Sequence, residues 1–150
     1  MFESSKQYLI VINKLLQLIE LTGMKKMSAP LKFLNVDIDI IGPTGGQVIA
    51  NYFRQQLIIL QNSPSLLSFE PLVMHSDANS CIASLACLIR AMPSDLKLLW
   101  SHSAARYFNV GYEGDLGMHS VTAEISSTSL QVMGEIGAQL RITIYAPQRA

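Results

Sequence analysis

Charged residues are scarce in this chain. Asp, Glu, Lys and Arg make up 15% of its 150 residues, against about 25% in ordinary soluble domains. The eleven basic residues balance the eleven acidic ones, so there is no net charge. Such a chain has no field to attract a polyanion, and we expect no nucleic-acid partner. A surface short of charge is typical of an oligomer or a partner-binding protein, although a crowded core has the same effect.

Cysteine is also rare, and long apolar runs are missing. Cys81 and Cys87 are six residues apart within a predicted helix, so their side chains point to different faces and do not bridge each other. We expect buried structural thiols and a cytoplasmic location. The apolar run 8–12 is interrupted by Asn13 and Lys14, whereas a membrane span needs about 20 apolar residues. We therefore expect no membrane association.

The first segment, residues 4–22, has the pattern of a helix that is apolar around most of its circumference. One of its apolar rows consists of Leu9, Ile12, Leu16 and Ile19. A polar stretch follows at 24–30. The pattern predicts a single domain in which residues 1–30 form an appended helix and linker and residues 31–150 form the domain proper. The helix packs either on its own core or on a second copy, and we favour self-association as a homodimer.

The rest of the chain alternates between strand and helix patterns. Leu34, Val36, Ile38 and Ile40 alternate with Asn35, Asp37 and Asp39, which predicts a half-buried strand. The further predicted strands are 66–74, which Pro71 confines to an edge or a bulge, 106–112, 120–125 and 140–145. The predicted helices are 47–60, one capped by Asp77 or Asn79 with the buried stripe Ile82, Leu85, Ile89 and Met92, 94–100, and one from 126–129 to Gly137. This order predicts an α+β fold with a mostly antiparallel or mixed sheet of four to five strands, helices on one face, and a hairpin before the last helix.

No metal or phosphate motif is evident. The histidines His75, His102 and His119 are far apart in sequence, and neither HExxH nor CxxC occurs. The Gly-rich segment 42–46 lies between a strand and a helix, where a phosphate cradle would lie. It lacks the Lys and Ser or Thr of a P-loop, so a plain turn is the favoured interpretation and an anion site the alternative. We expect no cofactor and no metal.

Catalytic groupings are equally weak. Residues 75–77, His-Ser-Asp, alternate faces on an extended chain and form no relay. Asp37 and Asp39 share one strand face about 7 Å apart, a separation suited to glycoside hydrolysis. The favoured interpretation is a solvated face, or acceptors for Arg106 or Arg141 across the sheet. We expect no enzyme activity, with a hydrolase using the two aspartates as an alternative.

The C-terminal part resembles a known family. Residues 125–145, ISSTSLQVMGEIGAQLRITIY, resemble the closing strand, serine-led helix, Gly-Ala turn and I-x-I-Y strand of a family of small bacterial domains. Members of that family resemble immunity proteins encoded beside toxin genes. The resemblance implies a cytoplasmic binding protein that neutralises a cognate toxin domain by occlusion, and it assigns no functional residue.

Tight complexes of this kind depend on a few aromatic and Arg anchors in the interface. The expected exposed anchors are Trp100, Arg106, Tyr107 and Tyr112, and the expected polar contacts are Asp37, Asp39, Glu113 and Asp115. A small-molecule or anion sensor that uses the sheet face or the 42–46 turn is the alternative from a different class.

Overall fold

The computed structural model describes residues 14, 17, 31–114 and 121–148 of the chain. The strands are β1 (Lys32–Ile41), β2 (Leu57–Asn62), β3 (Leu66–Pro71), β4 (Ala105–Glu113) and β5 (Gln139–Tyr145). The helices are α2 (Gly46–Phe53), α3 (Ala78–Arg90), α4 (Ser94–His102) and α5 (Ser127–Glu135). The predicted self-association row Leu9, Ile12, Leu16 and Ile19 lies outside the described residues, as does Asp115.

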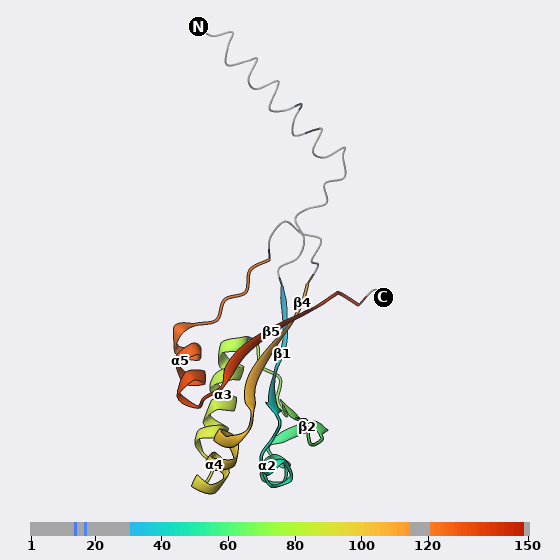
Figure 1. Cartoon of the computed structure of the whole chain (residues 1–150). Coiled ribbons are helices and arrows are strands. Elements are labelled where there is room, and N and C mark those ends of the chain that lie inside the picture. Colours follow the sequence, from blue (N-terminus) through green and yellow to red (C-terminus); the bar gives the residue numbers. More distant parts are fainter. Residues whose placement is uncertain (1–13, 15–16, 18–30, 115–120, 149–150) are drawn as a thin grey trace.

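The strands form one mixed sheet in the order β2-β3-β1-β4-β5 (Figure 1). The central strand β1 is antiparallel to both β3 and β4, and β2 is antiparallel to β3. β5 is parallel to β4, because α5 carries the chain back across the sheet between them. The α+β prediction is therefore confirmed. The predicted hairpin is wrong, since residues 121–125 form no strand and the last connection is a crossover.

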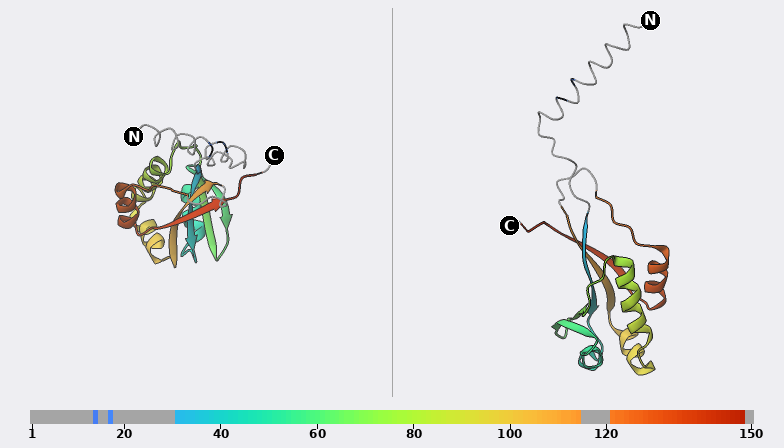
Figure 2. Two further views of the ribbon diagram at one scale, coloured as in Figure 1. Left: turned by 90° about the horizontal axis from the view of Figure 1, so that it is seen from above. Right: turned by 180° about the vertical axis from the view of Figure 1, so that it is seen from behind.

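The core lies between the sheet and the helices. In β1, Val36, Ile38 and Ile40 are at most 1% exposed, which confirms the predicted alternation for these three residues. The alternation is wrong at Leu34, because the register shifts between Phe33 and Asn35 and Phe33 packs against the core instead. Phe69 of β3 and Phe108 of β4 lie on either side of Ile38 in the sheet register. The α3, α4 and α5 helices lie beside this face of the sheet (Figure 2). The fourth helix, α2, reaches the same face through Phe53, whose ring packs edge-on against Phe69 at 5.6 Å.

The predicted helix 47–60 is wrong in its second half. The α2 helix ends at Phe53, and β2 begins at Leu57 as an edge strand paired with β3. The run 57–60 is apolar throughout, so periodicity does not distinguish helix from strand there. The β-branched Ile58 and Ile59 favour the strand. Pro71, expected at an edge or bulge, is instead the last residue of β3, an inner strand.

The α3 helix forms as its sequence predicts. Asp77 is the N-cap, and its carboxylate accepts a hydrogen bond from the Ser80 amide at 2.9 Å. The predicted stripe is buried, with at most 3% exposure at Ile82, Leu85, Ile89 and Met92. The expectation of two buried thiols is half wrong, because Cys81 is buried and Cys87 is exposed. No helix among the described residues has the length and apolar content to cross a bilayer.

Candidate functional site

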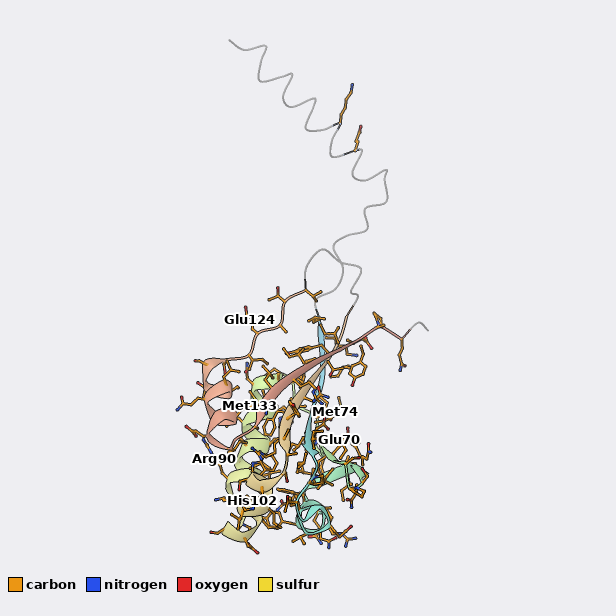
Figure 3. All side chains as sticks on the ribbon, in the orientation of Figure 1. Glu70, Met74, Arg90, His102, Glu124 and Met133 are labelled. Carbon is orange, nitrogen blue, oxygen red and sulfur yellow. The ribbon has the colours of Figure 1, made fainter. Side chains whose placement is uncertain are left out.

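The sheet face turned away from the helices carries polar side chains from four adjacent strands, and we call it the polar face. Its residues include Lys32, Asn35, Asp37, Asp39, Ser68, Glu70, Tyr107, Asn109, Glu113, Arg141, Thr143 and Tyr145. They share one face because successive side chains along a strand point to opposite faces of the sheet, and the apolar residues between them face the helices. The register places Asp39 between Ser68 and Tyr107, and Asn109 between Asp37 and Arg141. Glu70 of β3 is labelled in Figure 3.

Asp39 is the anchored carboxylate of the polar face. It is 8% exposed. The Ser68 hydroxyl donates to its Oδ1 at 2.6 Å, and the Asn109 amide donates to its Oδ2 at 3.4 Å. Arg141 Nη1 lies 3.7 Å from the same Oδ2, and the Thr143 hydroxyl donates to Asn109 at 2.7 Å. A buried carboxylate satisfied in this way fixes its neighbours across four strands.

Asp37 lies beside it in a different environment. Its one described hydrogen bond comes from the Asn35 amide at 3.5 Å, and that amide also donates to Glu70 at 3.2 Å. Burial, followed by the nearby carboxylates of Asp39 and Glu70, raises the pKa of Asp37 from 3.8 to about 6. Three carboxyl groups therefore share a small area, and one of them binds a proton unusually well.

Two tyrosines, Tyr145 and Tyr107, form the aromatic part of the polar face, and the inner one is Tyr107. The Arg141 guanidinium lies over its ring, 3.8 Å from the centroid, so the cation contacts both this ring and the Asp39 carboxylate. The strand aspartates were predicted to accept from Arg106 or Arg141; Arg141 does pair with Asp39, as an ion pair at 3.7 Å without a described hydrogen bond. The prediction is wrong for Arg106, which lies on the opposite face. Tyr145, at the end of β5, is 50% exposed.

Two of the predicted anchors are buried, and the expectation that they are exposed is wrong. Trp100 is 4% exposed and Tyr112 is 6% exposed. The Trp100 indole N–H donates to the Ile136 carbonyl at 2.7 Å, which ties α4 to the end of α5. The Tyr112 ring packs edge-on against Phe33 at 6.0 Å. Both side chains belong to the core because they occupy inward positions of α4 and β4. Residue type alone does not predict this, since Trp and Tyr are common both in cores and at interfaces.

Arg106 has a structural role and joins two segments of the chain by hydrogen bonds. Its Nη1 donates to the carbonyls of Trp100, Ser101 and Ser103, each at 3.0 Å, and its Nε donates to the Gly137 carbonyl at 2.9 Å. One guanidinium thus joins the C-terminal end of α4 to the α5–β5 turn. This is a different role from the exposed anchor expected at this position.

The remaining predicted positions contribute less. Glu113 is half-buried at the end of β4. In the 42–46 turn, the Gly42 amide donates to the Ser65 carbonyl and the Thr44 amide donates to the Ser103 hydroxyl. Two amides of that turn therefore already have protein partners. Among the described residues, no group of three His, Cys, Asp or Glu side chains could hold a metal ion.

Sequence reasoning missed several members of the polar face, namely Asn35, Ser68, Glu70, Asn109 and Thr143. A signal for them exists in the sequence. Ser68 and Glu70 alternate with apolar residues in LLSFE, and Asn109 follows the same rule in RYFNV.

Comparison of the chain with family models, curated proteins and solved structures finds no match.

Proposed function

We propose that this chain is an immunity-type binding protein whose polar face covers a cognate toxin domain and blocks it by occlusion. The observation that carries the proposal is the polar face itself. Its side chains belong to four hydrogen-bonded strands and are held by contacts across them. A surface fixed in this way loses little conformational entropy when a partner docks. The resemblance of residues 125–145 to immunity-like domains supports the same conclusion.

The chemistry of the polar face favours a basic partner surface. By the strand register it carries four carboxyl groups, Asp37, Asp39, Glu70 and Glu113, and two cations. The cations are Lys32 and Arg141, and Arg141 already contacts Asp39. Such an excess of acid steers a positively charged partner and disfavours an acidic one. Tyr107 and Tyr145 supply the aromatic contacts that dominate many interfaces.

Co-expression tests the proposal. The product of the neighbouring open reading frame is expressed with and without this protein, and relief of growth arrest is scored. Glu70→Lys and Tyr145→Ala should lose the protection. Leu130→Ala on α5 is the matched control, because Leu130 is 47% exposed and Tyr145 is 50% exposed. An absence of toxicity that this protein relieves would overturn the proposal, and so would full protection by both polar-face variants.

A second candidate is hydrolysis by Asp37 and Asp39. It is favoured by the contrast between the two carboxyls, since one has its pKa raised to about 6 and the other is held by three partners. Paired acids with different environments are typical of general acid–base catalysis. The test is hydrolysis of nitrophenyl glycosides by the wild-type chain. A rate that survives replacement of both aspartates by Asn would remove this candidate.

A further inference from the structure

A cleft of about 510 Å³ opens on the helix side of the sheet, away from the polar face. It lies where the ends of α3 and α5 meet α4 and the start of β4. Its size falls within the range of small-molecule sites, about 300–1,000 Å³. Ile89, Trp100 and Ile136 form an apolar wall, and charged side chains surround it. Arg90, labelled in Figure 3, lies at the α3 side.

The charges around the cleft are unequal. Among the described residues, three cations, Arg90, Lys97 and Arg106, line the cleft, and Glu135 is the one acid that does so. Glu135 forms an ion pair with Arg90 and also accepts a hydrogen bond from Gln131. Lys97 forms no ion pair with any described residue. The lining therefore has a net positive charge, which favours an anionic occupant.

Arg106 supplies a donor that is already in position. Its Nε and Nη1 are held by four carbonyls. Within the described part of the chain its Nη2 donates no hydrogen bond, and it is not buried. The side chain is therefore held in place by four carbonyls, while Nη2, on a residue that lines the cleft, keeps its donor capacity within the described part of the chain. A fixed, planar guanidinium is well suited to a carboxylate, and little entropy is lost when it binds.

We propose that this cleft binds a small organic carboxylate. The carboxylate contacts Arg106 Nη2 and Lys97, and the apolar body of the ligand packs on the wall that contains Trp100. The proposal is independent of the polar face, because the two surfaces lie on opposite sides of the sheet. Either one can fail without the other.

Trp100 gives a direct measurement. It is the one tryptophan in the sequence and it lines the cleft, so its fluorescence reports on occupancy. The full chain is titrated with sodium benzoate, with benzylamine as a cation that carries the same ring, and with sodium sulfate as an anion without an apolar body. We expect a saturable fluorescence change and a higher thermal midpoint with benzoate, and little change with the other two.

Substitutions of residues that line the cleft test whether benzoate binds there. Gly134 lines the cleft and a Cβ there meets no atom within 4 Å, so we expect the larger side chain of Gly134→Leu to occupy part of the cleft and abolish benzoate binding. Gly134→Ala is its control and should bind as the wild type does. Lys97→Gln should weaken binding by about fivefold, as expected for one partly screened charge. Lys32→Gln on β1, an exposed lysine outside the lining, should have no effect.

Three results would overturn the proposal. The first is that benzoate produces no saturable change in either the fluorescence or the thermal midpoint. The second is that benzylamine changes the fluorescence and the thermal midpoint as strongly as benzoate does. The third is a folded Gly134→Leu variant that binds benzoate with wild-type affinity.

Discussion

Replacing Asp37 by Asn should stabilise the protein at neutral pH. The folded pKa of Asp37, about 6, lies above its ordinary value of 3.8, so the folded chain holds this proton more tightly than the unfolded chain. The ionised carboxylate therefore destabilises the fold. A rise of this size corresponds to about 3 kcal/mol for a fully buried group. Asp37 is only half-buried, so screening by solvent reduces the expected gain to about 1 kcal/mol.

The pH dependence gives the sharper test. The destabilisation is absent below pH 3.8, grows as the pH rises towards 6, and is complete above that value. Urea denaturation of wild-type and Asp37→Asn proteins across this range should give free energies of unfolding that converge at low pH and diverge at neutral pH. Glu124→Gln, at an exposed loop position, is the control and should follow the wild type.

A contrasting variant separates the two aspartates. Asp39→Asn replaces an acceptor that holds Ser68, Asn109 and Arg141, so it should destabilise the protein at neutral pH. The reasoning is refuted if Asp37→Asn is less stable than the wild type at pH 7. It is also refuted if the difference between the two proteins does not shrink in acid.

The remaining predictions concern the helix side of the molecule. Arg106→Lys should lower the free energy of unfolding, measured by urea denaturation, by about 2 kcal/mol, because an ammonium group cannot reach all four carbonyls that the guanidinium holds. An unchanged free energy of unfolding would contradict a structural role for these hydrogen bonds. Gly137→Ala should lower the free energy of unfolding by about 1–2 kcal/mol, since the φ of Gly137 is 68°. Gly134→Ala in α5 should raise it by up to about 1 kcal/mol. Similar effects at both sites would show that backbone conformation is not the cause. A thiol-specific dye should label Cys87 in the native protein and Cys81 only after denaturation, because Cys81 is buried and burial raises its pKa to about 11; equal labelling rates would contradict the burial.

Sequence patterns predicted the elements that have a single clear period. The β1 strand was predictable because its apolar and acidic residues alternate, and the structure buries Val36, Ile38 and Ile40. The α3 helix was predictable because its cap and its apolar stripe agree. The β2 strand was not, because an apolar run of four residues fits a helix as well as a strand and its pairing with β3 decides the outcome.

The candidate site was predictable only in part. Asp37 and Asp39 were assigned to one face because strand geometry alone requires it. Their neighbours Ser68, Asn109 and Arg141 depend on which strands are adjacent, and that is information about the fold. Residue type misled at Trp100, since an aromatic side chain suits an interface and a core equally well.

The central position of β1 also sets a condition on how the chain reaches its native state during translation. β1 and β3, which pair on one side, are both synthesised before β4, the other partner of β1, which begins at Ala105. Contacts between such distant segments are slow to form. A nascent chain that stops before Ala105 leaves one edge of β1 unpaired and the core without Phe108. We therefore expect N-terminal fragments that end before β4 to aggregate, because an unpaired apolar strand is a template for other chains.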